Sequence, residues 1–224
     1  MIVSIIPVKK KSERVKDKNF KEFFKDKSIF DIKIEQLIKA KLINKIIISS
    51  NNLKLSTYEK LNKKIIFIKR NNKFCNNIIS WSDMIFHIIN SNRINDNDII
   101  VWSHTTSPLF SKFDEAISVY KKMEKKGYDS LIGVQKFNGF LLDNNSRPIN
   151  YNWGVWHKYS QFLDRYFLVN GSIFIGRKKT FLKTKYLTGI NPFKFLCSDI
   201  ESIDLDTELD FNFAQYIYSR LNDK

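Results

Sequence analysis

Glycine is scarce in this chain of 224 residues: there are seven, and none precedes Gly127. Phosphate-binding loops of the P-loop type and glycine-rich dinucleotide turns need glycines soon after an early strand, because the backbone must approach the phosphates closely. Neither loop can exist before Gly127. Any nucleotide bound by the first half of the chain would have to be held mainly by side chains.

Cysteine is scarcer still, and long apolar runs are missing. Cys75 and Cys197 are far apart and outside any metal-ligand spacing, which favours two reduced thiols in a reducing compartment over a disulfide framework. The opening "MIVSIIPVKKK" reaches its charges quickly, and no later run is long enough to span a bilayer. We therefore expect neither a signal peptide nor a membrane span, and a cytoplasmic protein.

Among the charged residues, positive side chains outnumber negative ones. Lysine and arginine number 38 against 23 acids, a formal net charge of +15. This excess predicts attraction to anions, but it does not separate nucleic acid, nucleotide, phosphosugar and anionic membrane surface. The lysines are spread along the whole chain, so part of the charge can serve solubility alone.

Short β-branched runs alternate with helical patterns through the first half of the chain. The runs expected to be buried parallel strands are 2–6, 45–49, 64–68 and 98–102, and the helical patterns are 30–42, 52–63, 79–92 and 112–126. Further strands are expected at 129–135 and 171–176, and a last helix at about 207–221. The alternation predicts right-handed βαβ units, hence one α/β domain over residues 1–224 with a Rossmann-like, mostly parallel sheet covered on both faces.

The segment from about 136 to 169 breaks this pattern. Its periodicity is lost and its aromatic content rises, with Trp153, Trp156, Tyr159 and Tyr166. It is long for a loop. We predict an extended arm that packs on a second copy of the chain, because its aromatics have no strand or helix of their own to cover them.

Ligands of open α/β sheets bind beyond the carboxyl ends of the strands, which directs attention to two early loops. The loop 7–20 is rich in cations, and is either a clamp for a polyphosphate or a solvated basic loop. The loop "SHTTSPLF" (103–110) brings hydroxyls and His104 to the same edge. Ser and Thr before a proline are also ordinary turn formers, and a lone histidine is more often structural than catalytic.

The third segment at that edge is "SIDLDTELDF" (202–211). Alternation along an expected strand places Asp204 and Asp206 on one side and Ile203 and Leu205 on the other. A capping box opening the last helix explains Thr207 and Asp210 but not the two preceding aspartates. A divalent cation shared between these carboxylates and substrate phosphates explains both, since magnesium rarely uses an all-protein cage.

Four segments resemble the acylneuraminate cytidylyltransferases, or CMP-sialic acid synthetases. They are "IIPVKKKSERVKDKNF", "HTTSPL", "VNGSIFI" and "SIDLDTELDF", and their order and spacing agree with the family from residue 5 to residue 215. The resemblance implies a three-layer, GT-A-like nucleotidyltransferase with a dimerisation arm. It also implies a reaction in which a sugar-acid hydroxyl attacks the α-phosphate of CTP, forming a CMP conjugate for surface glycan synthesis and releasing pyrophosphate.

The resemblance also implies roles for individual residues. Catalysis would fall to Lys9, Lys18, Arg70 and Asp206, and nucleotide binding to Lys9, Ser12, Lys18, Asn19 and Arg70. Asp204 and Asp206 would hold Mg²⁺ or Mn²⁺. The acceptor would meet His104, Thr106, Gln161, Arg165 and Asn170.

The chain departs from the family pattern at several of these positions. Glu13 stands where a lysine is usual, His104 stands at a glutamine, and Ser160 replaces an arginine. Arg165, five residues further along, is the shifted cation that a sugar-acid carboxylate would need. Without it, the acceptor would be a different hydroxy acid or a phosphonate, still activated with CMP.

A second class of function stays open from the sequence alone: a basic module that binds nucleotide or nucleic acid without catalysis. The aromatics of the arm fit stacking on bases as well as a dimer contact. The paired aspartates argue against nucleic acid at their edge of the sheet. The partners we expect are therefore CTP, a small acidic acceptor and a second copy of the chain, with no membrane and no nucleic acid.

Overall fold

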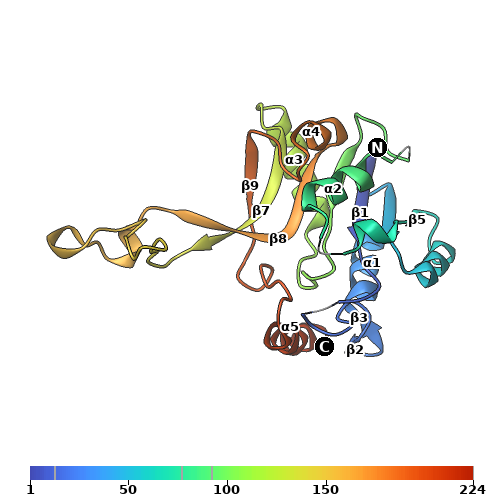
Figure 1. Cartoon of the computed structure of the whole chain (residues 1–224), viewed down its shortest axis with the longest axis horizontal. Coiled ribbons are helices and arrows are strands. Elements are labelled where there is room, and N and C mark those ends of the chain that lie inside the picture. The colour runs from blue at the N-terminus through green and yellow to red at the C-terminus, as the bar shows by residue number, and fades with distance from the viewer. Residues whose placement is uncertain (13, 77, 92, 224) are drawn as a thin grey trace.

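The structure is a computed structural model that describes residues 1–12, 14–76, 78–91 and 93–223, so Glu13 lies outside the described residues. Seven strands form one sheet in the order β5-β4-β1-β6-β8-β7-β9 (Figure 1). Their bounds are β1 (Ile2–Pro7), β4 (Lys45–Ser50), β5 (Ile65–Lys69), β6 (Ile99–Trp102), β7 (Ser130–Phe137), β8 (Tyr166–Arg177) and β9 (Pro192–Leu196). A small hairpin, β2 (Glu22–Phe24) with β3 (Lys27–Ser28), forms a separate two-stranded sheet.

Pairing in the large sheet is parallel except at β8. Strand β1 pairs in parallel with β4 and β6, β4 with β5, and β7 with β9, whereas β8 runs antiparallel to both β6 and β7. The Ile- and Val-rich runs of β1, β4 and β6 are buried almost throughout, as expected for parallel strands covered on both faces. The mostly parallel sheet predicted from the sequence is confirmed.

Helices cover both faces of this sheet. The helices are α1 (Ile29–Lys39), α2 (Trp81–Ile89), α3 (Phe113–Glu124), α4 (Lys178–Thr184) and α5 (Glu208–Asn222), with short 3₁₀ turns η1 (Leu53–Lys60), η2 (Asn72–Phe74), η3 (Gly154–Trp156) and η4 (Ser160–Phe162). One apolar cluster joins α1 and α3 to the sheet, and a second joins α2 and α4 to its other face. A third, smaller cluster seats α5 on α1 and the β2–β3 hairpin. The result is the three-layer arrangement that the alternation predicted.

Two local expectations differ from the structure, and some elements were not predicted. The pattern at 52–63 forms the 3₁₀ turn η1 rather than an α-helix. Residues 202–206 are not in a strand; they form an irregular segment that precedes α5. The edge strand β9 and the helix α4 were not predicted. The β9 sequence "PFKFL" begins with proline, which counts against a strand in a sequence pattern but is tolerated at the start of an edge strand.

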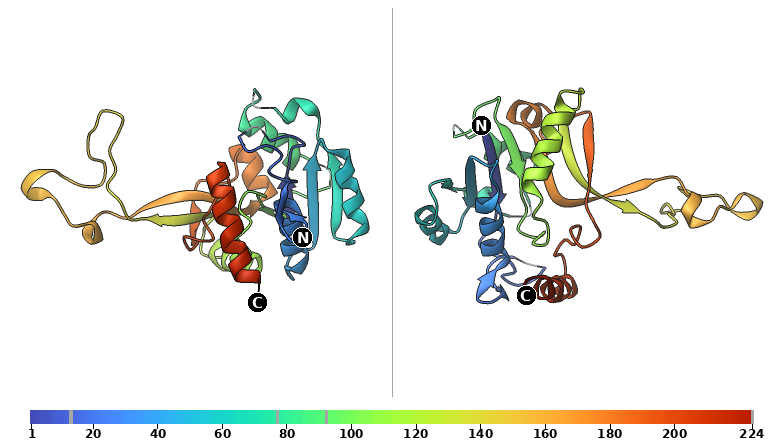
Figure 2. Two further views of the ribbon diagram at one scale, coloured as in Figure 1. Left: turned by 90° about the horizontal axis from the view of Figure 1, so that it is seen from below. Right: turned by 180° about the vertical axis from the view of Figure 1, so that it is seen from behind.

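The arm is the most conspicuous feature of the molecule. Strands β7 and β8 continue beyond the body as a two-stranded ribbon, and residues 138–165 extend it further (Figures 1 and 2). The backbone there is mostly irregular, with an isolated antiparallel bridge between Leu142 and Pro148 and the short turns η3 and η4. Side chains such as Val155 (93% exposed) and Trp156 (75% exposed) meet solvent in the single chain. The predicted arm is thus present, and its packing on a second copy stays a prediction.

Among the described residues, no helix is both long and apolar enough to cross a membrane.

Candidate active site

A cavity of about 970 Å³ opens at the carboxyl ends of β1 and β6. In the sheet, β4 and then β5 lie on one side of β1, and the next strand of the chain, β6, lies on the other side of β1. The connections leaving β1 and β6 therefore diverge, which leaves a crevice at the point where open α/β sheets bind their ligands. The size of the cavity suits a small molecule as large as a nucleotide.

Most of the predicted site residues line this single cavity. They are Lys9, Ser12, Lys18, Asn19, Arg70, His104, Thr106, Asn170, Asp204 and Asp206. Gln161 and Arg165 do not line it; both are exposed on the arm beyond the β7–β8 ribbon. The structure therefore brings together the residues predicted for nucleotide and metal, and separates two of the five predicted for the acceptor.

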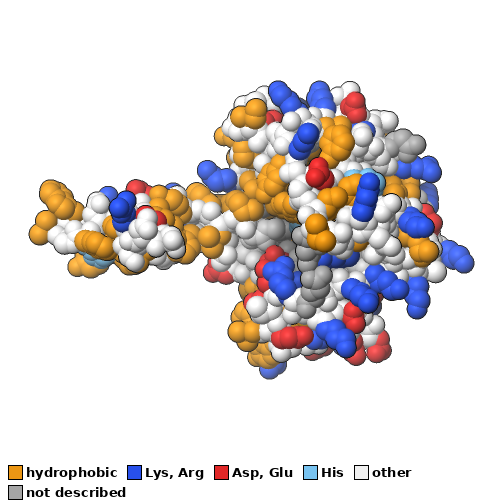
Figure 3. Space-filling view, in the orientation of Figure 1, with side chains coloured by type: hydrophobic (Ala, Val, Ile, Leu, Met, Phe, Trp, Pro, Cys, Tyr) orange, Lys and Arg blue, Asp and Glu red, His pale blue; other side chains and the backbone are white. Residues whose placement is uncertain are grey.

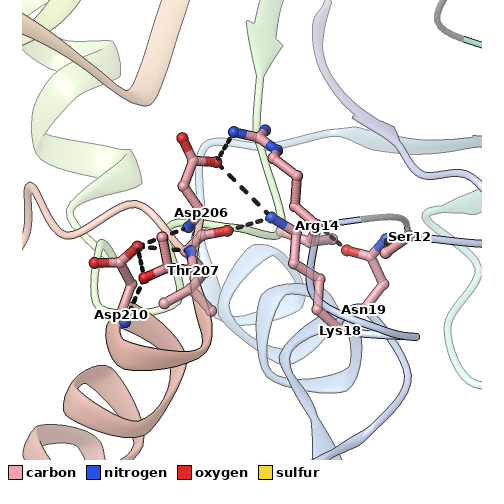
Figure 4. Close-up of polar contacts among 9 residues, drawn as sticks. Ser12, Arg14, Lys18, Asn19, Asp206, Thr207 and Asp210 are labelled. Carbon is pink, nitrogen blue, oxygen red and sulfur yellow. Dashed lines mark hydrogen bonds and ion pairs between the residues drawn. The ribbon is translucent and has the colours of Figure 1, made fainter.

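The loop after β1 is tied to the rest of the site by Lys18 and Asn19 (Figure 4). The buried Lys18 ammonium donates to the Leu205 carbonyl and lies 4.0 Å from Asp206 Oδ1. Burial lowers the pKa of Lys18, and Asp204 and Asp206 oppose that shift. Asn19 Oδ1 accepts from Thr105 Oγ1 at 2.8 Å, and Asn19 Nδ2 donates to Ser12 Oγ at 3.3 Å. Ser12, Lys18 and Asn19 of the basic loop are therefore held in place at the cavity wall.

The acidic segment is held by its backbone, which leaves its carboxylates at the cavity. The Leu205 side chain is buried, and its amide donates to the Thr106 carbonyl at 2.9 Å. Asp204 and Asp206 flank it and both line the cavity. Asp206 Oδ1 lies 2.8 Å from Arg14 Nη1. Desolvation by the surrounding protein raises the pKa of Asp204, the Thr106 hydroxyl opposes this, and the Asp206 charge raises it further.

The predicted capping box accounts for the other two acidic-segment residues. Thr207 accepts from the Asp210 amide, and the Asp210 carboxylate accepts from the Thr207 amide. Asp210 Oδ2 also accepts from the Asp206 amide at 3.1 Å. Thr207 and Asp210 thus begin α5, as one reading of the sequence had it, and Asp204 and Asp206 are left for another role.

The carboxylate pair fits a hard divalent cation shared with a ligand. Two carboxylates at one cavity wall repel each other, as the raising effect of the Asp206 charge on the Asp204 pKa indicates, and a cation would relieve that repulsion. Within the described residues no group of three or more His, Cys, Asp or Glu gathers as a self-sufficient metal site. Oxygen donors in this number suit magnesium or manganese that completes its coordination with phosphate and water.

Arg70 is a buried cation at the end of β5 that has only weak or neutral partners. Its Nη2 donates to the Val8 carbonyl at 2.9 Å, its Nε to Cys75 Sγ at 3.1 Å and its Nη1 to Met84 Sδ at 3.6 Å. In the part of the chain that is described, no carboxylate forms an ion pair with it. Thiol and thioether sulfur are poor acceptors, so the guanidinium is well suited to bind an anion in the cavity.

His104 begins an aromatic wall that the sequence did not suggest. Its ring lies 6.4 Å from Trp81 and 6.2 Å from Phe174, and Trp81 meets Tyr186 edge-on at 5.3 Å. Burial, and then the charges of Lys33 and Lys18, lower the pKa of His104 to about 4. The imidazole is therefore neutral at neutral pH, with one donor and one acceptor nitrogen.

Two further groups support the site from behind. The fully buried Lys33 of α1 donates to the carbonyls of Ser107 and Phe110 at 2.9 and 3.0 Å, which fixes the loop that carries His104 and Thr106. Asn170 donates from Nδ2 to Ser202 Oγ at 2.8 Å and accepts from the Ser172 amide. Its amide group thus links β8 to the acidic segment, a structural task in addition to the acceptor role predicted for it.

Sequence reasoning missed the aromatic wall, Arg14 and Lys33 as individual contributors. Arg14 was counted only as one charge of a basic loop, and the contact that distinguishes it joins residues far apart in the chain. Lys33 sits in a helical pattern at a position that proved fully buried. A charged residue on the apolar face of an amphipathic pattern was the one available signal for it.

No protein-family model matches the sequence. The chain is 23% identical over 228 residues to the N-acylneuraminate cytidylyltransferase of Escherichia coli, covering 99% of this chain and 53% of that protein. The chain thus spans about half the length of that curated relative.

Two solved structures have the same fold at low identity. The 2-C-methyl-D-erythritol 4-phosphate cytidylyltransferase of Francisella tularensis superposes with a TM-score of 0.68 at 16% identity, covering 96% of this chain and 98% of that one. The CMP:2-keto-3-deoxy-manno-octonic acid synthetase, solved with CTP, gives 0.67 at 10% identity, covering 98% and 99%. These likenesses establish an α/β nucleotidyltransferase-like fold.

Proposed function

We propose that this protein is a cytidylyltransferase that transfers CMP from CTP to the hydroxyl of a sugar acid and releases pyrophosphate. One observation carries the proposal: the cations Lys9, Lys18 and Arg70 share a single cavity with the carboxylates Asp204 and Asp206, at the ligand-binding edge of the sheet. Cations and a carboxylate pair together suit a metal-bound polyphosphate, whereas either alone would not. The names of the relatives and fold neighbours add support, because each is a cytidylyltransferase or a CMP-forming synthetase.

In this proposal the acceptor oxygen attacks the α-phosphorus of CTP. The new bond joins that oxygen to the α-phosphorus, the bond from the α-phosphorus to the bridging oxygen breaks, and pyrophosphate leaves with the electron pair. The hydroxyl proton passes to solvent. Such transfers depend mostly on positioning and charge compensation. In this proposal Lys9 and Lys18, assisted by Arg70, compensate the triphosphate, and Ser12 and Asn19 hold the nucleotide by hydrogen bonds; all five line the cavity.

Asp204 and Asp206 would hold the magnesium or manganese ion, which when bound polarises phosphate oxygens and neutralises developing charge. Arg14 now pairs with Asp206. Its ion pair is exposed on both sides, so it contributes little stability and can give way to a cation.

For the acceptor we favour a sialic acid-like sugar acid over a phosphonate or another hydroxy acid. The aromatic wall of Trp81, His104 and Tyr186 offers a broad surface on which the carbon framework of a sugar can pack. A small phosphonate would leave most of that surface uncovered. Neutral His104 is placed to exchange a hydrogen bond with a hydroxyl or amide of the acceptor.

The proposal is tested by measuring pyrophosphate release with CTP, ATP, GTP or UTP, each with sugar acids, hydroxy acids and phosphonates in the presence of magnesium. We expect activity with CTP and a sugar acid, and its loss on chelation of the metal. Asp204→Asn and Asp206→Asn should each remove most of this activity while the circular dichroism spectrum stays unchanged. Near wild-type turnover in both variants would contradict the metal assignment, and activity with only a non-sugar acceptor would contradict the substrate class.

A further inference from the structure

A second cavity, of about 780 Å³, lies between α2 and the β4–β5 side of the sheet. The residues on its apolar floor are Ile47, Ile68, Phe86 and Ile88. It shares Arg70, Phe74 and Ile79 with the candidate active site, and its other lining residues do not reach that site. The proposed transfer reaction makes no use of this cavity.

Cations outnumber acids at this second cavity. Lys69, Arg70 and Lys73 line it, and none of the three forms an ion pair among the described residues. Among the described lining residues the acid is Asp83, which accepts a hydrogen bond from the Ser80 hydroxyl at the start of α2 and offsets part of this charge. Space-filling Figure 3 shows that Lys and Arg side chains are numerous over this face of the body. The lining therefore has a net positive charge that favours an anion.

An aromatic stack lies beside these cations. The rings of Phe74 and His87 are 3.8 Å apart between centroids and inclined by 9°, and Lys73 Nζ lies 4.9 Å from the Phe74 centroid. Burial, and then the charges of Lys73 and Arg70, lower the pKa of His87. The positive charges of Lys73 and Arg70 therefore act on His87, a residue of the cavity lining. A planar ligand could extend the stack over the apolar floor.

Arg70 connects the two cavities. It is 4% exposed and lines both. Two of the three hydrogen bonds of the guanidinium go to sulfur atoms, which are weak acceptors. An anion in either cavity would be a stronger acceptor for these N–H groups. A single guanidinium cannot serve two anions in different cavities equally well. Occupation of one cavity should therefore weaken binding in the other, and by the same factor in both directions.

We propose that the second cavity is a regulatory site for a small aromatic anion, which engages Lys73 and Arg70 and weakens nucleotide binding in the active site. The aromatic body packs on the Phe74–His87 stack and the apolar floor, and the anionic group meets the cations at the rim. The binding step stands without the proposed transfer reaction, whereas the antagonism rests on it.

The experiment uses 1-naphthyl phosphate as the probe, titrated into the full chain and followed by its fluorescence. Inorganic phosphate lacks the ring and 1-naphthol lacks the charge. We expect saturable binding of the probe, and at least about tenfold weaker binding of each control compound. If 1-naphthol binds as tightly as the probe, the cavity recognises only the aromatic ring. If inorganic phosphate binds as tightly, the cavity recognises only the charge. Either result overturns the proposal.

Two variants locate the probe. Lys73→Glu reverses a charge at the rim and Phe86→Asp places an acid on the floor; both side chains are exposed and line only the second cavity. Each should weaken the probe about tenfold or more. Lys54→Glu, an exposed charge reversal on η1 outside both cavities, should not. Wild-type binding in both cavity variants would overturn the site.

Antagonism is measured as the dissociation constant of CTP with and without saturating probe. We expect it to rise about fivefold or more in the wild type and to stay constant in Lys73→Glu. A constant value in the wild type would overturn the link through Arg70. If CTP does not bind at all, the proposed function fails, while the probe titration still decides the second site.

Discussion

Lys18 and Lys10 belong to the same basic loop but have different surroundings. Lys18 is buried, bonded to the acidic segment and aimed at the cavity, whereas the Lys10 side chain is exposed and absent from the cavity lining. A fixed charge in a desolvated site acts far more strongly on a developing charge than a solvated one. The loop is therefore expected to act through particular residues and not as a diffuse cloud of charge.

We predict that Lys18→Ala lowers kcat/KM for CTP by an amount that corresponds to about 3 kcal/mol of lost transition-state stabilisation, as is usual when one preorganised donor is lost. Lys10→Ala should cost less than about 1 kcal/mol, since it removes only a screened surface charge. Steady-state kinetics on both variants, with thermal unfolding to confirm the fold of Lys18→Ala, checks this. Equal losses in the two variants would show that the loop acts only through its total charge.

His104 gives a pH-dependent prediction at the same scale. Its pKa is lowered to about 4 in the folded state, whereas an unfolded histidine titrates near its ordinary value of about 6.5. Above both values the imidazole is neutral in either state and has no effect. As the pH falls below about 6.5, His104 gains a proton in the unfolded state but stays neutral in the folded state, so the free energy of unfolding decreases. Below about pH 4 both states are protonated, and this loss of stability no longer grows.

The substitution His104→Gln removes this titration without emptying the position. Between pH 7 and pH 4.5 we expect the wild type to lose about 2 kcal/mol more unfolding free energy than the variant, because the carboxylates titrate alike in both. Urea unfolding at the two pH values measures the difference. Identical pH dependence of the two proteins would mean that the His104 pKa is not lowered.

At the scale of elements, the start of α5 decides where the acidic segment lies. The Thr207–Asp210 capping box closes the first turn, and Asp210 also binds the amide of Asp206. The cap therefore fixes the chain direction just after the two cavity aspartates. An error in the cap would be transmitted to their carboxylates.

We predict that Thr207→Ala destabilises the protein by about 1 kcal/mol, the usual cost of losing a side-chain N-cap. Ser219→Ala is the matched control: its hydroxyl also bonds to a backbone group of α5, but near the carboxyl end, and it should cost less than about 0.5 kcal/mol. Chemical denaturation of both variants gives the comparison. Equal effects would show that the capping box contributes nothing beyond an ordinary surface hydroxyl.

The elements also show which parts of the fold the sequence could predict. The strands β1, β4 and β6 are buried on both faces, so their continuous Ile and Val runs mark them without knowledge of any neighbour. Residues 202–206 alternate as a strand would, yet they pair with no strand among the described residues. The Leu205 amide and the buried Leu205 side chain hold them in place instead. Strand β9 depends on its partner β7, 62 residues earlier in the chain, as the pairing of Leu131 with Phe193 shows.

The candidate site was predictable where chain order alone determines position. Residues after β1, β5 and β6 must meet at one edge of a parallel sheet, and Lys18, Arg70 and His104 do so. Gln161 and Arg165 follow no such rule, because the length and direction of the β7–β8 ribbon place them. No local pattern gives the direction of a ribbon that leaves the body.

At the scale of the whole molecule, the arm differs from the body in how closely its exposed apolar side chains follow one another. Residues 153–162 include five large apolar side chains that are each at least 61% exposed. On the body such side chains, for example Leu61 and Ile190, lie in separate segments, and lysines and arginines are numerous (Figure 3). Exposed apolar patches of this extent mark an interaction surface. The hypothesis of a homodimer formed through the arm rests on this contrast. In such a dimer Gln161 and Arg165, which lie away from the cavity of their own chain, would contact the second copy.

We predict a dimer at micromolar concentration that Val155→Asp converts to monomer, because a buried carboxylate at an apolar contact is costly. Val155 is 93% exposed in the single chain and lies on the arm, whereas Leu209 is 77% exposed on α5 of the body. Leu209→Asp is therefore the matched control and should leave the dimer intact. Sedimentation velocity separates the outcomes: a monomeric wild type, or a dimer that only Leu209→Asp dissociates, would exclude the arm as the contact.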